Sequence, residues 1–492
     1  MDLYTFYSIL CQLFIIIFVP VVGLFVIRQW ILVRKSRMYK SADAVNVGVF
    51  HPFCNAGGGG ERVLWCAVRA LQEKYDNVKI IIYTGDVDCS PSEIREKARQ
   101  LFNVVVDANT NFIYLKNRRW IDPKMFPYFT LLCQSFGSLV LGFEALFRFP
   151  PDVLIDTMGF SFVLPVFRFL GACRVGCYVH YPTISMDMLS RVKNRQFSHN
   201  NKMYVIRNPF LTWLKMTYYQ IFAKLYCWVG RSSQTVIVNS SWTENHILDL
   251  WKVPFKTHRV YPPCEINSLK ALPRIENKNS YTILSVGQFR PEKDHPMQLQ
   301  AMYDLRTLLA DNEDLWNKIR LIIVGSCRNE EDYERLKNMQ DLSKHLSLEK
   351  TVEFKVNVPH HELLEYYKSS KIGIHTMSNE HFGISIVECM AAGLIMVAHR
   401  SGGPLLDIIE TSEGCQTGFL AMDAKDYANC ILNIIYSSEE ENHMISNAAR
   451  YALIVIIYIE VFRNLASVER FSEKEFEVNF LRAVGPLFNE TT

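Results

Sequence analysis

The chain has 492 residues, of which 49% are hydrophobic and 21% charged, and a formal net charge of +3. This length is too great for one ordinary domain and suffices for two buried cores, while the composition excludes a disordered chain and a multi-span transporter. The nearly balanced charge gives no field that would favour nucleic acid as a partner. The thirteen cysteines lack the paired spacings of zinc sites, so we expect reduced core thiols in a reducing compartment.

The first predicted element is a membrane-spanning helix within residues 1–40. No charged residue occurs from Leu3 to Ile27, and this length crosses a hydrocarbon core of roughly 30 Å. A cleaved signal peptide is the main alternative, but the basic residues follow the apolar run, from Arg28 to Lys40, and no small-residue cleavage site closes it. Because positive residues stay on the cytoplasmic side, we expect a single-pass anchor and a basic spacer, with the rest of the chain in the cytosol.

Residues 41–265 show the pattern of a first Rossmann-like domain. Short apolar runs, typical of buried parallel strands, alternate with helical patterns. The strands are expected at residues 45–50, 79–83, 152–155, 174–179 and 235–238. Residues 203–230 form an aromatic-rich helical segment with interspersed lysines, which suits either a membrane interface or the core of the domain. The apolar runs 128–149 and 160–170 leave the same two alternatives open.

A polar, proline-containing stretch, 262–280, precedes a second series of the same kind. Its strands are expected at residues 282–286, 321–324, 352–354, 371–374 and 395–397. We therefore predict an α/β fold of two doubly wound domains facing a cleft, the second covering residues 266–445, with ligands at the carboxyl ends of the strands. Residues 446–492 are expected to be helical and contain an apolar run, 451–462, that is too short to span a membrane.

Four glycines, Gly57, Gly58, Gly59 and Gly60, lie between the first strand and a helical pattern over residues 61–74. Glycine lets the backbone approach an anion, and a helix N-terminus favours negative charge, so a phosphate or sugar phosphate is the expected ligand. The fingerprint of dinucleotide binding is broken here, however, and no lysine with serine or threonine follows as in a P-loop. A tight strand-to-helix turn without a ligand is the alternative interpretation.

Two cations, Arg290 and Lys293, follow the strand predicted at 282–286. From a loop at that position they would point into the cleft, where they would stabilise the charge that grows on a leaving nucleoside diphosphate without the help of a metal. Taken alone, an Arg-x-x-Lys is usually a pair of solvated surface cations, so this interpretation depends on the motif that comes next.

That motif is a Glu-x7-Glu between a strand and a helix, formed by Glu380 and Glu388. Its spacing puts one carboxylate in the loop and the other about two turns into the helix, where they can hold sugar and ribose hydroxyls. Phe382, Gly383 and Ile384 offer backbone amides at the helix N-terminus for phosphate or hydroxyl oxygens. Two glutamates at this spacing are common by chance, so the motif gains weight only together with the others.

Taken together, the motifs resemble the retaining glycosyltransferases of family four, which have the GT-B fold. They occur in this order over nearly the whole soluble part of the chain: Gly57 to Arg62, His180-Tyr-Pro, Asn239-Ser-Ser-Trp242, Val286-Gly-Gln-Phe-Arg-Pro-Glu-Lys-Asp-His295, Val324-Gly-Ser, Glu380 to Glu388 and Met390-Ala-Ala-Gly393. The anchor and the segments Tyr178-Val-His-Tyr-Pro-Thr-Ile-Ser185 and Tyr261-Pro-Pro-Cys264 resemble more closely the GDP-mannose-dependent α-1,2-mannosyltransferases of the dolichol-linked oligosaccharide pathway.

The resemblance implies a role for each candidate residue. Arg290 and Lys293 would bind the diphosphate of the donor, and Glu388 would hold the ribose. Glu380, with the amides of the residues that follow it, would hold the mannose, and the glycine loop would also contact the donor. His180 stands where the family places a histidine beside the transferred sugar. A histidine after a strand is more often structural, but its position in the motif favours the functional interpretation.

The implied reaction moves mannose from GDP-mannose to Man(3)GlcNAc(2)-PP-dolichol and then to the Man(4) product, with retention of configuration. No covalent carboxylate nucleophile is evident, and the family is thought to react at the front face. No metal and no other cofactor is expected, although Asp86-Val-Asp88 matches the metal-binding DxD of the other major glycosyltransferase fold, a pattern that recurs by chance. The expected location is the cytoplasmic face of the endoplasmic reticulum membrane, with other mannosyltransferases of the pathway as partners.

Three other functions are compatible with parts of the pattern. Residues that bind a diphosphate do not identify the base or the sugar, so another donor such as UDP-N-acetylglucosamine fits equally. A non-catalytic membrane scaffold could keep the same fold, although the full set of predicted cleft residues argues against it. An NAD-dependent oxidoreductase is disfavoured because neither domain carries the dinucleotide fingerprint.

Overall fold

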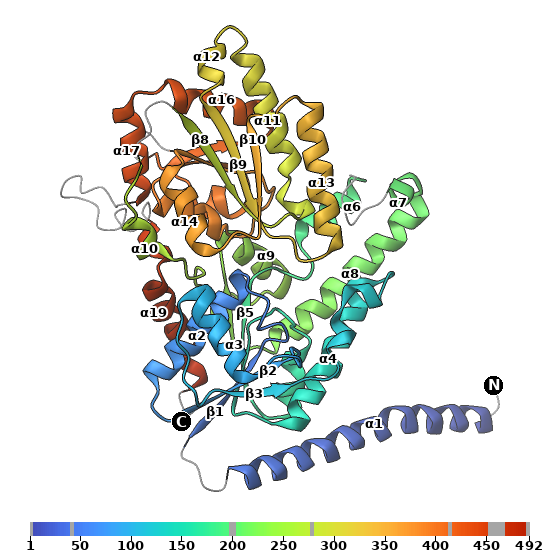
Figure 1. Cartoon of the computed structure of the whole chain (residues 1–492). Helices are drawn as coiled ribbons and strands as arrows, with labels where there is room; N and C mark the ends of the chain where they lie inside the picture. The colour runs from blue at the N-terminus through green and yellow to red at the C-terminus, as the bar shows by residue number, and fades with distance from the viewer. Residues whose placement is uncertain are drawn as a thin grey trace. The chain divides into compact units, whose positions relative to one another are not determined.

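The computed structural model describes residues 3–39, 44–195, 203–275, 280–411, 416–450 and 468–488. Their contacts divide the chain into two compact units, each built around a parallel sheet (Figure 1). The first unit comprises Met1–Val238, Thr243–Arg259 and Asn479–Thr492, and the second comprises Asn239–Trp242 and Val260–Val478. Two α/β units with parallel sheets confirm the predicted fold class.

The first unit has a seven-stranded sheet in the order β3-β2-β1-β4-β5-β6-β7, and all its pairings are parallel. The strands are β1 (Val45–Phe50), β2 (Val78–Thr84), β3 (Asn111–Tyr114), β4 (Val153–Asp156), β5 (Arg174–Val179), β6 (Thr235–Val238) and β7 (Thr257–Arg259). The five predicted strands are confirmed. The remaining two, β3 and β7, are the edges of the sheet.

Helices connect these strands, as parallel pairing requires. They are α2 (Gly59–Lys74), α3 (Pro91–Phe102), α4 (Thr130–Arg148), α5 (Val163–Pro165), α6 (Met186–Lys193), α7 (Met203–Arg207), α8 (Pro209–Arg231) and α9 (Ser241–Trp251). Two apolar clusters form the core. One joins Leu141, Ala145 and Leu146 of α4 to the strands, and the other joins Phe222 and Tyr226 of α8 to them. Every cysteine whose side chain is described is a free thiol, as expected.

The N-terminal helix α1 runs from Leu3 to Met38 with Pro20 inside it. The predicted anchor, residues 3–27, falls on its first part, where most side chains lie outside the described residues, so the anchor stays a prediction. The basic residues after it continue the helix instead of forming a spacer. Lys35 pairs with Asp152 at 3.1 Å, and Arg34 donates to the carbonyl of Arg148 at 3.1 Å, which joins this end of α1 to the first unit.

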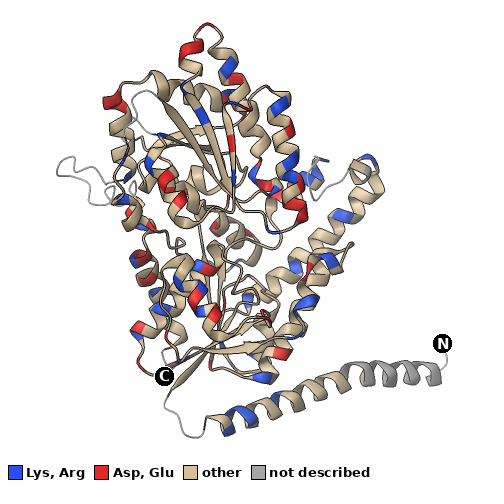
Figure 2. Cartoon of the chain, in the orientation of Figure 1, with Lys and Arg blue, Asp and Glu red and all other residues tan. Residues whose placement is uncertain are grey.

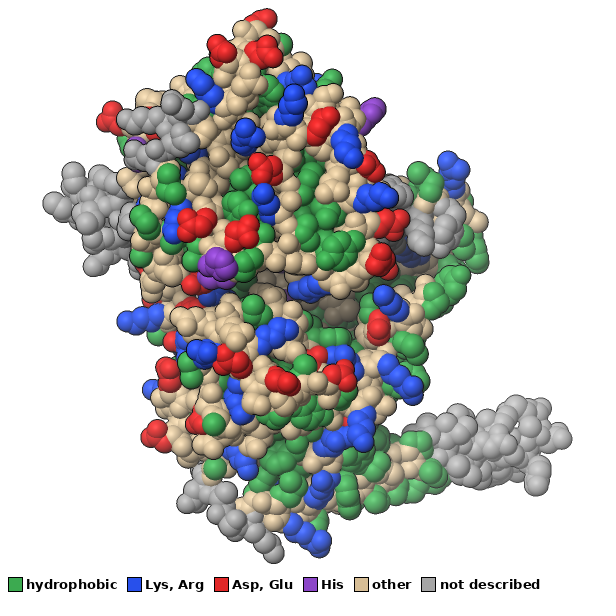
Figure 3. Space-filling model, viewed as in Figure 1, with side chains coloured by type: hydrophobic (Ala, Val, Ile, Leu, Met, Phe, Trp, Pro, Cys, Tyr) green, Lys and Arg blue, Asp and Glu red, His purple; other side chains and the backbone are tan. Residues whose placement is uncertain are grey.

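Two of the apolar segments, 128–149 and 203–230, form helices that pack in the core of the first unit. Among the residues that the structure describes, α4 is the one helix long and apolar enough to cross a membrane, and its inner face belongs to the core. In α8, Phe222 and Tyr226 are buried, whereas Trp213, Ile221 and Trp228 are more than half exposed. Charged residues are few along α8, and hydrophobic side chains gather on the surface over it (Figures 2 and 3). This helix is both a core element and an exposed apolar surface.

The second unit has a six-stranded parallel sheet in the order β10-β9-β8-β11-β12-β13. Its strands are β8 (Tyr281–Val286), β9 (Ile319–Gly325), β10 (Val352–Val356), β11 (Ile372–His375), β12 (Ile395–His399) and β13 (Gly418–Ala421). The five predicted strands are again confirmed, and the one the sequence does not reveal, β13, is an edge strand.

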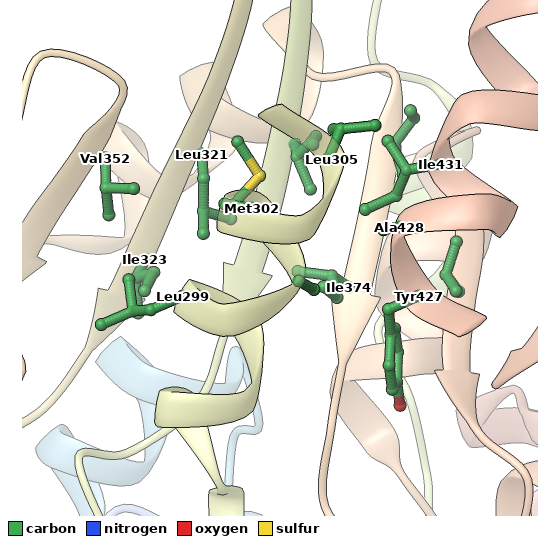
Figure 4. Close-up of a cluster of buried hydrophobic side chains, with 14 of the residues drawn as sticks. Leu299, Met302, Leu305, Leu321, Ile323, Val352, Ile374, Tyr427, Ala428 and Ile431 are labelled. Carbon is green, nitrogen blue, oxygen red and sulfur yellow. The ribbon is translucent and has the colours of Figure 1, made fainter. Parts of the chain in front are cut away.

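Helices cover both faces of this sheet. They are α10 (Ile266–Lys270), α11 (His295–Leu308), α12 (Glu313–Trp316), α13 (Glu330–His345), α14 (His360–Ser369), α15 (Ile384–Ala391), α16 (Ala424–Tyr436), α17 (Glu439–Arg450) and the first part of α19 (Glu473–Val484). Figure 4 shows Leu299, Met302 and Leu305 of α11 packed with the strands and with Ile431 of α16. Burial of each such side chain contributes about 1.5 to 3 kcal/mol to stability, which fixes the strand ends that carry the site.

The C-terminal residues return to the first unit. Thr235 of β6 donates to the carbonyl of Ala483 at 2.9 Å, and the ring of Phe488 stacks on Tyr75 with centroids 4.5 Å apart. At Gly176 of β5 an added Cβ would come within 2.8 Å of Leu487, so the close packing of this end requires glycine there. The predicted boundary at residue 446 thus differs from the structural division, which falls within α19. The predicted apolar run 451–462 lies outside the described residues.

Candidate active site

The candidate site of the second unit lies where its strand order reverses. Strands β8 and β11 are parallel neighbours, but the chain continues from β8 to β9 on one side of the pair and from β11 to β12 on the other. Ligands of open α/β sheets bind outside the carboxyl ends of the strands at such a point. The segment with Arg290 and Lys293 follows β8, and the segment with Glu380 follows β11. Both predicted motifs of this unit therefore start from the two strands at the switch point.

The structure brings Lys293 and Glu380 into direct contact. Lys293 Nζ lies 2.5 Å from Glu380 Oε2, and His375 Nε2 lies 2.9 Å from the same oxygen. The backbone amide of His381 donates to the other oxygen, Oε1, at 3.1 Å. Sequence reasoning did not single out His375. The signal that would have found it is a polar residue ending an apolar strand, Ile372–His375, five positions before the glutamate.

The charges of this cluster follow from burial and from its three partners. Burial opposes ionisation of Glu380, but the charge of Lys293 and the hydrogen bond from His375 outweigh it and hold its pKa well below the ordinary value. Burial, reinforced by the positive charge of Lys293, lowers the pKa of His375. The cluster is therefore a carboxylate between a cation and a neutral imidazole whose Nε2–H donates.

Several hydrogen bonds fix the backbone around the cluster. Thr376 Oγ1 donates to the carbonyls of Lys293 and Asp294, at 2.9 and 3.0 Å, and so joins the two loops. Gln298 donates to Thr376 Oγ1 at 3.1 Å, and the hydroxyl of Tyr427 donates to the carbonyl of His375 at 2.8 Å. Buried bonds of this kind hold a site on rigid elements, so the side chains of the cluster are its adjustable part.

The Glu-x7-Glu segment turns into α15 as predicted. Gly383 precedes the helix with φ +113°, a left-handed conformation that favours glycine, and no side chain caps the helix there. Ile384 is the first helical residue, so the first backbone amides of α15 have no capping side chain. The Phe382 ring is buried against Phe471, with centroids 5.1 Å apart, so this residue offers only its backbone.

The two remaining predicted residues of this unit are Glu388 and Arg290. Glu388 is half-buried in the second turn of α15, where its charge helps burial to raise the pKa of Tyr367 well above the ordinary value. Arg290 is 41% exposed, and its guanidinium lies 3.6 Å from Glu292. Such a pair in solvent contributes little to stability, which leaves the guanidinium available to an anion.

The first unit has a polar cluster at its own switch point, between β1 and β4. His51, Thr157 and His180 follow the neighbouring strands β1, β4 and β5. His180 Nε2 donates to the carbonyl of Thr157 at 3.0 Å, and His51 Nδ1 lies 2.8 Å from the Thr157 hydroxyl. An added Cβ on Gly60 would lie 3.7 Å from His180 Nε2, so the predicted histidine and the predicted glycine loop are neighbours.

The glycine loop has an internal anion. Gly57 has φ +81°, as a tight turn requires, and the amide of Gly58 donates to the carboxylate of Glu61 in a capping box. Burial opposes ionisation of Glu61, but His51, 3.5 Å away, and the Gly58 amide outweigh it and lower its pKa. One amide of the predicted phosphate loop is thus already bound to a carboxylate. Glu61 therefore competes with any phosphate for this amide, which the glycine pattern alone does not reveal.

Asp86 of the DxD pattern has partners within the protein. It pairs with Arg118 and accepts from the backbone amide of Asn55 at 3.0 Å, while Asp88 is exposed. Among the residues described here, no group of three or more His, Cys, Asp or Glu is placed to hold a metal ion. The independence of the reaction from metal stays a prediction.

Comparison with known proteins identifies the family. Residues 44–251 match the family described as ALG11 mannosyltransferase N-terminus, and residues 272–451 match Glycosyl transferases group 1. A protein of Homo sapiens named GDP-Man:Man(3)GlcNAc(2)-PP-Dol alpha-1,2-mannosyltransferase is 47% identical, over 93% of this chain and 91% of its own. A relative of the same name from Xenopus laevis is 46% identical, over 97% and 94%.

Solved structures show the fold. The crystal structure of Anabaena Alr3699/HepE in complex with UDP and glucose aligns with 90% of this chain and 100% of its own, with a TM-score of 0.59 and 14% sequence identity. At that identity the likeness concerns the two-domain architecture alone. The relatives from Homo sapiens and Xenopus laevis, by contrast, share nearly half of their residues with this chain. This chain therefore belongs to the family of the GDP-Man:Man(3)GlcNAc(2)-PP-Dol alpha-1,2-mannosyltransferases and is a glycosyltransferase of the GT-B fold.

Proposed function

We propose that this chain transfers mannose from GDP-mannose to Man(3)GlcNAc(2)-PP-dolichol and then to the Man(4) product, forming α-1,2 linkages with retention of configuration. The observation that carries the proposal is the likeness, over nine tenths of the chain, to relatives whose names give GDP-mannose, the Man(3) acceptor and an α-1,2 linkage. The carboxylate and the two cations at the switch point of the second unit support it, because they match the needs of a sugar diphosphate donor.

In this proposal Arg290 and Lys293 bind the diphosphate. The bond that breaks joins the anomeric carbon to the β-phosphate oxygen, and negative charge grows on the departing GDP. Cations placed in advance at that point stabilise the transition state more than the ground state. The exposed position of Arg290 suits an approach of the diphosphate from solvent, and the more buried position of Lys293, beside Glu380, suits a role at the breaking bond.

Glu380 and Glu388 are assigned to the hydroxyl groups of the donor. Glu380 is ionised and accepts hydrogen bonds, which suits a mannose hydroxyl, with the amides of Phe382, Gly383 and Ile384 beside it. Glu388, in the next turn of α15, is assigned to the ribose. The carboxylates orient the donor, and Arg290 and Lys293 neutralise the charge of its diphosphate, so no metal and no further cofactor is required in this proposal.

For the first unit we propose binding of the acceptor, with His180 as its contact to the transferred mannose. The imidazole is oriented by the carbonyl of Thr157, which fixes Nε2 as the donor and leaves Nδ1 as the nitrogen without that role. Gly60 leaves room beside this imidazole, where an added Cβ would lie 3.7 Å from Nε2, and we assign it to the donor together with Gly58 and Gly59.

The proposed location is the cytoplasmic face of the endoplasmic reticulum membrane, with α1 as a single-pass anchor. The exposed apolar face of α8 supports contact with the same membrane, where Trp213 and Trp228 suit the interface. Other dolichol-pathway mannosyltransferases are proposed as partners there.

The orientation of the chain in the membrane is tested at Asn489, whose sequon should carry no glycan in a eukaryotic host. The second sequon cannot report, because Asn239 is buried. A glycosidase-sensitive mass shift would reverse the orientation.

The function is tested with the full chain purified in detergent. Incubation with radiolabelled GDP-mannose and a diphospholipid-linked Man(3)GlcNAc(2) acceptor should give products longer by one and two hexoses, and an α-1,2-specific mannosidase should release the label. The matched negative control is Glu380→Ala, with folding checked by thermal melting. Labelled UDP-N-acetylglucosamine is offered in parallel. Transfer from that donor, or label resistant to the mannosidase, would refute the proposal.

A further inference from the structure

The carboxylate of Glu380 is engaged by three donors of the chain itself. Lys293 Nζ and His375 Nε2 both contact its Oε2, at 2.5 and 2.9 Å, and the amide of His381 contacts its Oε1. A carboxylate has about four acceptor positions, and three are used here. One position remains, so a carboxylate that accepts two hydroxyl groups from a sugar needs one of these donors to leave.

Exposure distinguishes the donor that leaves from the one that stays. The side chain of Lys293 is 22% exposed and its stem lies over Gly287, whereas that of His375 is 6% exposed and forms the end of a central strand. The lysine can swing on four rotatable bonds. The imidazole is held by the packing of β11 and by the bond from Tyr427 to its carbonyl.

We propose that donor binding exchanges the partners of Glu380. Lys293 leaves the carboxylate for the diphosphate, which frees one acceptor site for the sugar, while His375 keeps the carboxylate in position. This inference rests on the proposed function and adds two features to it. His375 is a positioning residue, which acts through Glu380 and does not touch the donor. The ion pair between Lys293 and Glu380 is a cost that the diphosphate must overcome.

The charged surroundings of His375 agree with a neutral, donating imidazole. It faces Lys293 and Glu380 from the loops, His399 from β12 and His295 from α11. Burial lowers the pKa values of His399 and His295, the latter to about 3, so they add no positive charge near neutral pH. The hydrogen bond from Nε2 therefore persists when Lys293 moves away, and it limits the rise of the Glu380 pKa.

The exchange predicts an unusual response to Glu380→Gln. GDP carries the diphosphate and lacks the sugar. Its binding must therefore break the ion pair between Lys293 and Glu380, and it gains no sugar contact with Glu380 in return. The substitution removes that cost, so GDP should bind about two- to fivefold more tightly, the size of one partly exposed ion pair. Transfer from GDP-mannose should fall at the same time. Equilibrium binding of GDP to the full chain measures the first effect, and equal or weaker GDP binding would overturn the exchange.

The positioning role is tested with two amides of different reach. The longer side chain of His375→Gln can place its N–H near the position of Nε2, whereas His375→Asn is too short. The Asn variant should lose about tenfold in kcat with GDP-mannose, the value of one hydrogen bond to a charged group, without loss of GDP affinity. The acidic limb of its kcat/KM profile should move to higher pH, because the Glu380 pKa rises when a donor is lost. His375→Gln should restore both.

The control is His295→Asn, a buried histidine of the same cluster whose ring packs on Phe289 with centroids 5.4 Å apart. It should leave the acidic limb in place. If the Asn and Gln variants at 375 lose activity equally, or neither moves the limb, the residue is only structural and the inference fails while the function stands. If the parent chain transfers no mannose from GDP-mannose, the proposed function fails and this inference with it.

Discussion

Lys293→Ala is the perturbation that examines the leaving-group assignment most directly. In the protein alone the lysine is bound to Glu380 at 2.5 Å, so its gain from a ground-state diphosphate is offset by the loss of that pair. In the transition state the charge on the diphosphate is larger and the balance favours the phosphate. We therefore expect a loss of about 2 to 4 kcal/mol in transition-state stabilisation, as for other preorganised charge stabilisers, which is roughly a 30- to 1000-fold fall in kcat.

The assay is steady-state transfer of labelled mannose at varied GDP-mannose and saturating acceptor. The fall should appear in kcat, with a change in donor KM of less than about fivefold, because an interaction made mainly in the transition state affects turnover. The matched control is Lys371→Ala. That lysine is also 22% exposed and pairs with Glu439 at 3.1 Å, but it lies at the opposite end of β11. A folded Lys293→Ala enzyme with unchanged kcat and only a weaker donor KM would refute the reasoning.

Three further outcomes are expected. Glu388→Ala should raise the donor KM more than it lowers kcat, since a ribose contact is equal in ground and transition states; a kcat defect with normal KM contradicts this. Burial raises the pKa of Asp156 from 3.8 to about 7, so between these pH values the folded state binds a proton that the unfolded state releases. The free energy of unfolding should therefore fall by about 4 kcal/mol as the pH rises from about 4 to 7. Asp156→Asn should flatten that dependence in thermal melts. Chelator should leave most activity, and Asp86→Asn, by weakening the Arg118 pair, should lower stability more than turnover; restoration of a chelated enzyme by manganese would argue for a metal.

Much of the fold could be predicted because buried parallel strands are continuous apolar runs, readable without any neighbour. Strands β1, β5 and β6 begin and end where the sequence places them. The three strands that the sequence does not reveal, β3, β7 and β13, are all at sheet edges. An edge strand is short and covered on fewer sides, so Thr257–Arg259 contains only polar residues and carries no apolar signal.

The candidate site divides in the same way. Lys293 and Glu380 could be named from local motifs, since glycine, cation and carboxylate spacing is a property of the chain. Their contact could not, because 87 positions separate them and only the pairing of β8 with β11 brings them together. The contact of His375 with Glu380 was hidden for the same reason. In sequence His375 is one polar residue at the end of a strand, and only the folded loop that ends in the turn at Gly383 places Glu380 beside it. Local pattern determined which residues can do chemistry, and tertiary structure decided which of them meet.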